Sequence, residues 1–169
     1  SSGLVGSEMC IRDSDDIVIG TGAEDFYALG GGDDWVASIQ GNDAILAGTG
    51  NDTVYGGHGF DNIYGQDGDD LLIGAGSDDL LIGGAGNDEL YGGIGADMIL
   101  GGTGDDIFIG GIGGDIINGG DGTDIAVYRD VFADFIFTSA AGRHFFNGGQ
   151  DMADWGRDAL INVEYAQFL

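Results

Sequence analysis

Apolar side chains recur every nine residues through most of this chain. Aligned in nines, residues 11–127 form thirteen consecutive units without an insertion. The eighth column is apolar throughout, with Val18, Tyr27, Val36, Ile45, Val54, Ile63, Leu72, Leu81, Leu90, Ile99, Phe108, Ile117 and Ala126. Because alternate side chains of a strand point to opposite faces, columns seven to nine predict a short strand whose middle residue faces a core.

The first six columns of each unit predict a tight turn, because they are rich in glycine, which tolerates positive φ and close backbone approach. A three-residue strand buries little by itself, so the units must stack on one another. Two strands and two turns make a coil of eighteen residues, and the repeat gives about six and a half coils. We therefore expect an all-β fold, a right-handed parallel β-roll (a β-solenoid) with a small C-terminal β-rich cap.

Aspartate occupies the sixth column of every unit, from Asp16 to Asp124. Alternate units share an edge of the roll, so these residues form two rows in which carboxylates one strand spacing apart would repel each other. The whole chain has 30 acidic residues against four Lys and Arg, a formal net charge of −26. A bound cation would offset this repulsion, whereas a metal-free solenoid that uses Gly and Asp only as turn formers is the alternative.

Calcium is the cation that the available donors favour. It takes six to eight oxygens from carboxylates and backbone carbonyls, at ~2.3–2.6 Å. Magnesium prefers to keep its waters. Zinc and copper are disfavoured on chemical grounds, because Cys10, His58 and His144 lie far apart in the sequence.

The units resemble the RTX (hemolysin-type) calcium-binding nonapeptide, Gly-Gly-x-Gly-x-Asp-x-U-x, over about two-thirds of the chain; Gly83–Tyr91 and Gly92–Leu100 are good copies. The resemblance implies several Ca²⁺ ions held by column-six aspartates and by glycine carbonyls of the turns. The implied carboxylate ligands are Asp34, Asp43, Asp52, Asp61, Asp70, Asp79, Asp88, Asp97, Asp106, Asp115 and Asp124. The implied carbonyl ligands are Gly48, Gly50, Gly57, Gly59, Gly68, Gly84, Gly86, Gly93, Gly95, Gly102, Gly104, Gly111, Gly113, Gly120 and Gly122.

Some units depart from this pattern. Leu29 replaces the first glycine of its unit, and Ser77 replaces a fourth-column glycine. Ser38-Ile39-Gln40 replaces the whole glycine-rich start of another unit. We expect these turns to bind calcium weakly or to stay empty.

The two ends of the chain differ from the repeat, which we assign to residues 14–127. Residues 1–13 resemble a translated sequencing-adaptor sequence. Residues 128–169 contain two expected strands, Val131–Thr138 and Arg143–Phe146. The segment from Gly156 to Phe168 is similar to the ending of serralysin-like type I secreted proteins, which implies a cap on the roll that overlaps an export signal. Arg157 and Asp158 are expected to form a structural pair there.

The charge argues against binding to nucleic acid or to anionic membranes, and no stretch approaches the length of a transmembrane span. Zinc-protease, nucleophile-elbow and phosphate-loop motifs do not occur, so we expect no enzymatic activity in this chain. The sequence favours a calcium-binding module of a larger secreted, extracellular protein, which folds on binding Ca²⁺ after export by a Gram-negative type I secretion machinery.

Two alternatives stay open, the tail of a secreted hydrolase such as a serralysin-like metalloprotease, and an adhesive or structural repeat module. The outward columns seven and nine are also unusually apolar, which indicates contact with an upstream domain or with another copy. These columns include Ile17, Phe26, Trp35, Leu71, Ile73, Leu80, Ile82, Leu100, Ile107 and Ile109.

Overall fold

Strands are the only regular elements in the part of the chain that the structure, a computed structural model, describes: residues 8–10, 14–128, 136–140, 143–147, 157–163 and 165–168. Those of the repeat are β2 (Ile17–Ile19), β3 (Phe26–Gly31), β4 (Trp35–Ala37), β5 (Ala44–Thr49), β6 (Thr53–His58), β7 (Asn62–Asp67), β8 (Leu71–Gly76), β9 (Leu80–Ala85), β10 (Glu89–Ile94), β11 (Met98–Thr103), β12 (Ile107–Ile112), β13 (Ile116–Asp121) and β14 (Ile125–Tyr128). The terminal strands are β1 (Glu8–Cys10), β15 (Ile136–Ala140), β16 (Arg143–Asn147), β17 (Arg157–Ile161) and β18 (Tyr165–Phe168). Within these residues, no helix could cross a membrane.

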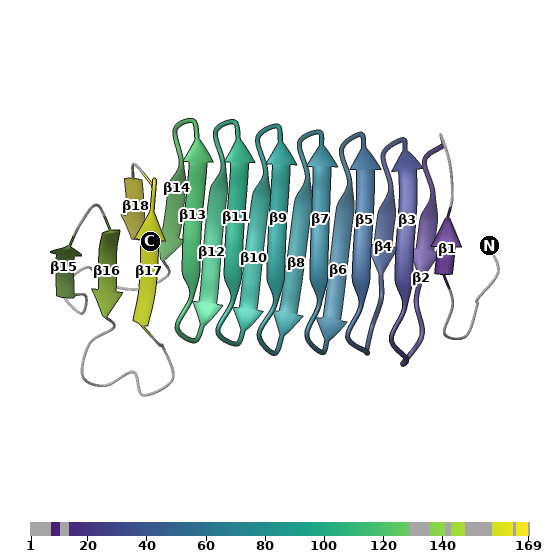
Figure 1. The fold of residues 1–169 in the computed structure, drawn as a ribbon, viewed down its shortest axis with the longest axis horizontal. Coiled ribbons are helices and arrows are strands. Elements are labelled where there is room, and N and C mark those ends of the chain that lie inside the picture. Colours follow the sequence, from purple (N-terminus) through teal and green to yellow (C-terminus); the bar gives the residue numbers. More distant parts are fainter. Residues whose placement is uncertain are drawn as a thin grey trace.

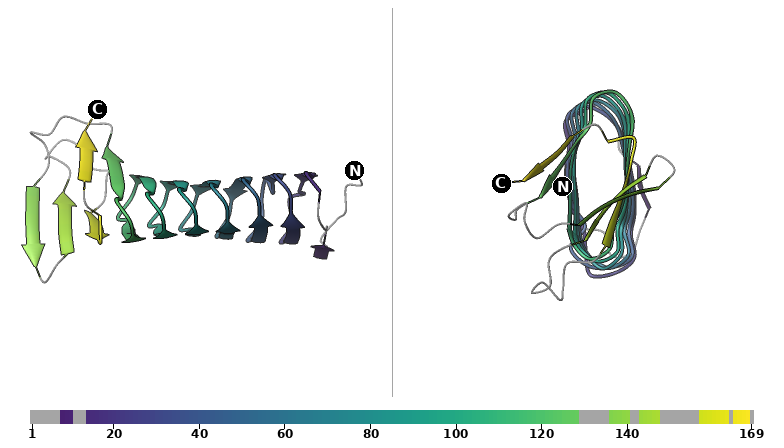
Figure 2. Two further views of the ribbon diagram at one scale, coloured as in Figure 1. Left: turned by 90° about the horizontal axis from the view of Figure 1, so that it is seen from above. Right: turned by 90° about the vertical axis from the view of Figure 1, so that its left-hand side faces the viewer.

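From β1 to β14, consecutive strands alternate between two sheets of parallel strands, which face each other across a narrow core (Figures 1 and 2). Sheet A has the order β1-β3-β5-β7-β9-β11-β13-β17-β16-β15, and sheet B has the order β18-β14-β12-β10-β8-β6-β4-β2. Within the repeat, paired residues are eighteen positions apart, as in Met98↔Ile116. This register confirms the parallel β-roll, with one coil for every two nonapeptides.

The strands of the repeat are mostly longer than we expected from columns seven to nine. In β11 the ladder pairs Met98, Ile99 and Leu100, passes over Gly101, and resumes at Gly102 and Thr103. The strand therefore runs on through the first three columns of the following unit. The prediction that all six leading columns form a turn was wrong, because the turn is confined to columns four to six.

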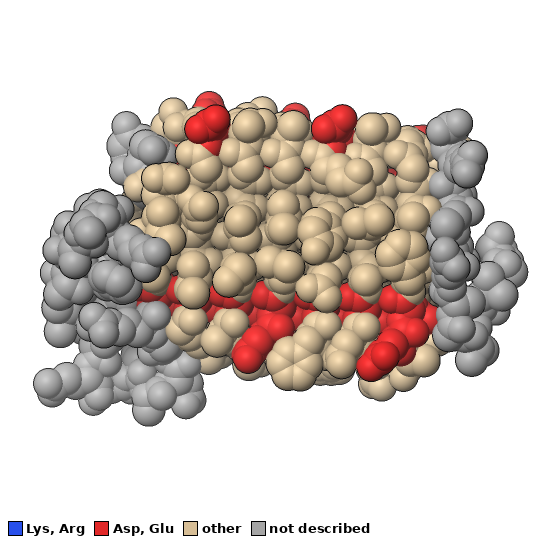
Figure 3. All heavy atoms as spheres, in the orientation of Figure 1, with Lys and Arg blue, Asp and Glu red and all other residues tan. Residues whose placement is uncertain are grey.

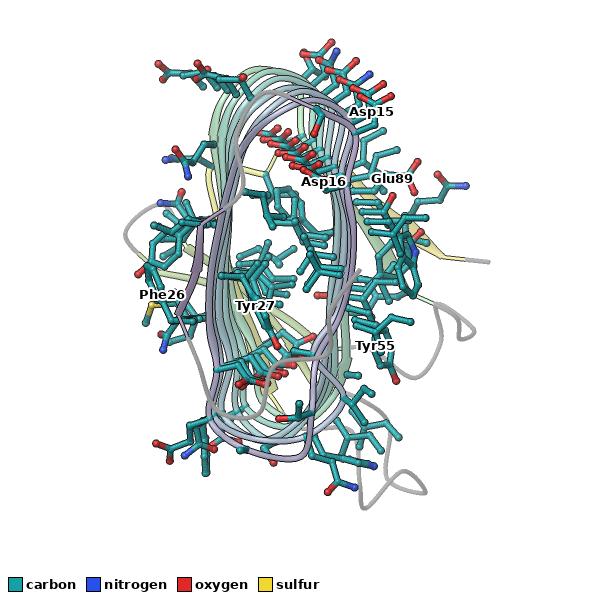
Figure 4. All side chains as sticks on the ribbon, turned by 90° about the vertical axis from the view of Figure 1, so that its right-hand side faces the viewer. Asp15, Asp16, Phe26, Tyr27, Tyr55 and Glu89 are labelled. Carbon is teal, nitrogen blue, oxygen red and sulfur yellow. The ribbon has the colours of Figure 1, made fainter. Side chains whose placement is uncertain are left out.

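The core is built mainly from side chains of the eighth column, joined by Leu29 and Ala47 of column one. All thirteen members of the eighth column are buried, from Val18 to Ala126, and Phe108 is the largest of the fully buried side chains. The columns on either side point outward as predicted: Phe26 projects from the coil while Tyr27 fills it (Figure 4). Ile17 is 72% exposed at the N-terminal end of sheet B.

The terminal segments extend both sheets. Strand β1 pairs in parallel with β3 in the register of the repeat, Glu8↔Phe26, although residues 1–13 lack the repeat's glycines. At the other end, β15 and β16 form an antiparallel hairpin that joins β17. The predicted strand Arg143–Phe146 is confirmed in β16. The prediction for Val131–Thr138 is met at Ile136–Thr138, and its earlier residues lie outside the described part.

Strands β17 and β18 form a further coil on the end of the roll. β17 pairs in parallel with β13, and β18 pairs in parallel with β14. Leu160 of β17 is 2% exposed and continues the buried stack of the eighth column. The cap is therefore joined to both sheets by backbone hydrogen bonding.

Candidate metal centre: two buried aspartate rows

The chain takes up left-handed φ angles at two columns of each unit, column two near the end of the strand and column four in the turn. Before β11, Gly93 of β10 has φ 114° and Gly95 in the turn has φ 150°, which an L side chain rarely adopts. Every glycine that we predicted as a carbonyl ligand has such a positive φ. Where other residues stand in these columns, as at Gln66 and Ser77, they are held at φ 86°. The turn geometry therefore persists through the departures from the glycine pattern.

The column-six aspartates line the inside of the two edges. The upper row in Figure 4 contains Asp16, Asp34, Asp52, Asp70, Asp88, Asp106 and Asp124, and the lower row contains Asp25, Asp43, Asp61, Asp79, Asp97 and Asp115. From Asp34 and Asp43 onward, each Oδ1 accepts a hydrogen bond from the backbone N–H of the aspartate one coil earlier. The Asp70 N–H donates to Asp88 Oδ1 at 2.8 Å, for example. One oxygen of each carboxylate thus ties successive turns together.

The other oxygen, Oδ2, is buried without a hydrogen-bond partner through most of both rows. This holds for Asp34, Asp43, Asp52, Asp61, Asp70, Asp79, Asp88, Asp97, Asp106 and Asp115. A buried polar atom without a partner costs about 1–3 kcal/mol, and more when it is charged. Two carboxylates ~4.8 Å apart repel by a further ~3 kcal/mol at an effective dielectric constant of ~20. A cation in either row would offset both costs.

The pKa values of these carboxylates also indicate that the rows need positive charge. Burial raises the pKa of Asp70, Asp79 and Asp97 to about 7, and the N–H donated by the preceding aspartate offsets part of the rise. Burial likewise raises the pKa of Asp61 and Asp88 to about 6. The metal-free fold thus favours protons where a metal would otherwise supply positive charge.

A space beside each Oδ2 is kept open by glycine in column one. A Cβ on Gly74 would meet Asp79 Oδ2 and would lie 2.9 Å from the carbonyl oxygen of Gly92 in the next coil. A carboxylate oxygen and a carbonyl oxygen of the next coil line the same space beside Gly65, Gly83, Gly92 and Gly101. Column-one glycine was absent from our predicted ligand set, although its unbroken run from Gly56 to Gly119 was a signal in the sequence.

The turns nearer the N-terminus fill this space with side chains. Leu29, Ser38 and Ala47 stand in column one and are fully buried. The Ser38 hydroxyl donates to the carbonyl oxygen of Gly56 at 2.5 Å. The predicted ligands Asp34, Asp43 and Asp52 belong to these turns, so their surroundings differ from those of Asp61 to Asp115.

The first aspartate of the lower row is satisfied by protein donors. Asp25 Oδ2 accepts hydrogen bonds from the Tyr27 hydroxyl at 2.8 Å and from the Thr21 hydroxyl at 3.1 Å. A Cβ on Gly20 would meet the same Tyr27 hydroxyl. The Asp25 carboxylate therefore has its hydrogen-bond partners without a metal.

Sequence reasoning missed one member of the lower row. Asp158 was expected to pair with Arg157, whose side chain lies outside the described part, but its Oδ1 accepts the Asp115 N–H at 2.9 Å, as the next aspartate of the row would. The Asp158 side chain is 6% exposed. The signal in the sequence was Gly156-Arg157-Asp158, which matches columns four to six. The repeat spacing does not lead to Asp158, because 43 residues separate it from Asp115, whereas successive aspartates of a row are eighteen residues apart.

A second ladder of side chains runs along the outside of the upper edge. The column-five oxygens of Asp15, Asp33, Asn51, Asp69, Asn87 and Asp105 each accept the backbone N–H of column five in the next coil. On the lower edge, Asn42 and Asp78 make this bond. These side chains lie outside the turn, as Asp15 does in Figure 4, so paired carboxylates such as Asp69-Asp70 point to opposite sides of it.

The outer surfaces of the sheets carry little charge. In columns seven and nine of β2–β14 the one charged residue is Glu89, and acidic side chains gather at the margins of the broad face (Figure 3). His58, the last residue of β6, is exposed.

The donors present fit calcium. Among the residues that the structure describes, no three His, Cys, Asp or Glu side chains converge on one point. An ion in either row would therefore take backbone carbonyl oxygens together with Oδ2. An all-oxygen set of this kind suits Ca²⁺ and not zinc or copper.

Comparison with known proteins gives the family. The family model of the RTX calcium-binding nonapeptide repeat (4 copies) matches residues 39–72, 64–99 and 91–126. No curated protein matches the chain. The matches together span more than half of the sequence and coincide with the two aspartate rows, so the chain belongs to the family of RTX calcium-binding nonapeptide repeat proteins.

Proposed function

We propose that this chain is a calcium-binding β-roll module that folds when it binds Ca²⁺ outside the cell, after type I secretion. The observation that carries the proposal is the line of buried Oδ2 atoms without hydrogen-bond partners in both rows. A stable metal-free protein would satisfy or expose such atoms.

The strongest sites are those in which column one is glycine. There, Asp61, Asp70, Asp79, Asp88, Asp97, Asp106, Asp115 and Asp124 would hold the ions through their carboxylates, with carbonyl oxygens of the turns completing the shell. The turns with Leu29, Ser38 and Ala47 would bind more weakly, because side-chain atoms fill the corresponding space. Bound calcium supplies the positive charge that the rows lack.

Folding and export follow from the same charges. With little calcium, as in a cytosol, repulsion along both rows favours an extended chain that a secretion channel can accept. With millimolar calcium, binding to the folded state alone adds its free energy to that of folding. RTX repeats are typical of secreted proteins, which supports an extracellular location and a type I secretion machinery as partner.

We assign the chain to the C-terminal part of a larger exoprotein and place any catalytic activity in another region of that protein. Its similarity to serralysin-like endings supports this position, as does the cap formed by β15–β18.

Isothermal titration calorimetry on calcium-depleted protein tests the binding itself. We expect several Ca²⁺ ions per chain, with affinities of about 10⁻⁴–10⁻³ M as in extracellular modules, and no comparable heat from magnesium. A protein that binds no calcium at millimolar concentration would refute the proposed function.

A further inference from the structure

The outer face of sheet B carries more large exposed apolar side chains than the outer face of sheet A. Those of sheet B are Ile17, Ile19, Trp35, Tyr55, Ile94 and Ile107, whereas those of sheet A are Phe26, Met98 and Ile116. They stand in columns seven, nine and three, which point away from the core. Single apolar side chains are normal on a surface, but a contiguous face of them marks a place of contact.

The same face carries almost no charge, although the chain has a net charge of −26. In columns seven and nine of its strands β2–β14, and in column three of β6, β8, β10 and β12, the one charged residue is Glu89. Its Oε2 accepts the Tyr91 hydroxyl at 3.1 Å. Sheet A differs, because its column three contains Asp67 in β7 and Asp121 in β13. The face of sheet B therefore suits a partner surface that is itself apolar and uncharged.

The size of the face matches what a stable dimer needs. Sheet B has eight strands, and those of full length, such as β6, extend over six residues. At ~4.8 Å between strands and ~3.3 Å per residue, the face measures roughly 34 by 20 Å. Two such faces in contact bury on the order of 1,300 Å², and specific protein interfaces bury about 1,200–2,000 Å². A second copy of the chain thus offers a surface of the required area and character.

The charges beside the face determine how two copies can meet. The column-five ladder, with Asp69 and Asp105, lies at the upper margin, where the strands of sheet B begin (Figure 4). The strands end at the lower margin, with column-three residues such as His58 and Ile94. A twofold axis parallel to the roll places the acidic margin of one copy against the lower margin of the other. An axis along the strands would instead bring two acidic margins together, and these would repel each other.

We propose that the outer face of sheet B binds a second copy of this chain about a twofold axis parallel to the roll. Tyr55 is the third of the six residues of β6, so it lies near the axis and faces Tyr55 of the second copy. The inference rests on the proposed function, because the face exists only when the coils are stacked. Calcium thereby controls association as well as folding, and bound ions also reduce the repulsion between two acidic chains.

Tyr55→Glu is the test variant, because it places two carboxylates opposite each other across the axis. Tyr64→Glu is the matched control. Tyr64 is the same residue type in the same column of the next unit, but it lies in β7 and faces outward from sheet A. Sedimentation velocity of the full chain in saturating calcium, at ~1 to ~100 µM protein, measures the dimer dissociation constant. Circular dichroism of the same samples shows whether the roll has formed.

We expect the calcium-bound chain to form a dimer and the metal-free chain to stay monomeric. Tyr55→Glu should weaken association by at least about thirtyfold, as loss of a central interface residue does, and Tyr64→Glu by less than about threefold. A folded, calcium-bound chain that stays monomeric would overturn the inference. So would a Tyr64→Glu variant that weakens association as much as Tyr55→Glu, since the face of sheet B would then have no special role.

A second variant covers a failure of Tyr55→Glu to fold. Ile94→Glu changes a side chain that is 61% exposed at the lower margin, where the acidic margin of the second copy would lie. It should also weaken association by at least about thirtyfold, and an unchanged dissociation constant would contradict the proposed arrangement.

The unsubstituted chain separates this inference from the proposed function. If calcium binds and folds the chain but no dimer forms, the interface is wrong and the module function stands. If the chain does not bind calcium, the proposed function fails as well.

Discussion

At the scale of single residues, each column-six aspartate divides its tasks between two oxygens. Oδ1 accepts a backbone N–H from the preceding coil and so stabilises the turn, while Oδ2 is buried and lacks a hydrogen-bond partner in most positions. Replacement by asparagine separates the two, because the amide keeps an oxygen for the backbone N–H and removes the charge.

Asp79→Asn is therefore expected to have opposite effects with and without calcium. Without calcium it stabilises the roll, because it removes repulsion within the lower row, and with saturating calcium it destabilises the roll by about 1–3 kcal/mol. Urea unfolding in both conditions measures the change. Asp78→Asn is the control, since Asp78 is exposed and its oxygen serves the outer ladder; a loss of stability in both conditions for Asp79→Asn would contradict the division of tasks.

Column-one glycine provides a second test at this scale. Gly83→Ala places a methyl group against Asp88 Oδ2 and 2.8 Å from the Gly101 carbonyl oxygen. We expect calcium binding to that turn to weaken by about tenfold or more, because overpacking of such a space costs about 1–3 kcal/mol.

Gly76→Ala is the matched substitution for Gly83→Ala. Its added methyl would lie 3.3 Å from the His58 side chain, at the far end of a flexible group, and Gly76 does not require a positive φ. Calorimetry that shows equal calcium binding for the two variants would contradict a role for column one.

At the scale of elements, the outer ladder of the upper edge stabilises the turns independently of metal. The Asn51 side-chain oxygen accepts the Asp69 N–H at 2.9 Å. Thr123 is the last residue of the ladder, and it takes part through its backbone N–H, which donates to Asp105. Asn51→Ala should lower the free energy of unfolding in saturating calcium by about 0.5–1.5 kcal/mol, and Thr123→Ala should leave it within about 0.5 kcal/mol. Equal losses in urea unfolding would refute the ladder's contribution.

The nine-residue period was enough to predict the parallel roll, its buried eighth column and the two rows of aspartates along its edges, because stacking leaves a three-residue strand no other way to bury its middle side chain. It failed to predict strand length, since columns one to three carry the glycines typical of turns, yet pair with the neighbouring coils. It also missed β1 and the role of Asp158, because backbone pairing in parallel sheets places few demands on side chains and brings β17 beside β13 across a long separation in sequence.

At the scale of the whole molecule, the charge of −26 and the two rows make stability depend on pH as well as on calcium. Burial raises the pKa of Asp70, Asp79 and Asp97 to about 7 in the folded chain, well above the ordinary value of 3.8. The folded state then holds more protons than the unfolded state between pH ~4 and ~7, so the metal-free roll is stabilised below pH ~4 and loses this contribution as the pH rises to ~7.

In calcium-depleted buffer we therefore expect acid to replace calcium in part, with more β-structure at pH ~4.5 than at pH ~7.5. In saturating calcium the dependence reverses, because protons compete with the metal for the same oxygens. Circular dichroism across this range measures both, and metal-free protein that gains β-structure as the pH rises would contradict the buried rows.

The central claim is that calcium drives the folding of the roll, and a calcium titration of the metal-free protein at pH ~7.5, followed by far-UV circular dichroism with magnesium as the control, tests it most directly. We predict a cooperative change from a disordered to a β-rich spectrum with calcium and none with magnesium. A spectrum that is already β-rich without calcium and does not respond to it would contradict this claim and leave a metal-independent solenoid.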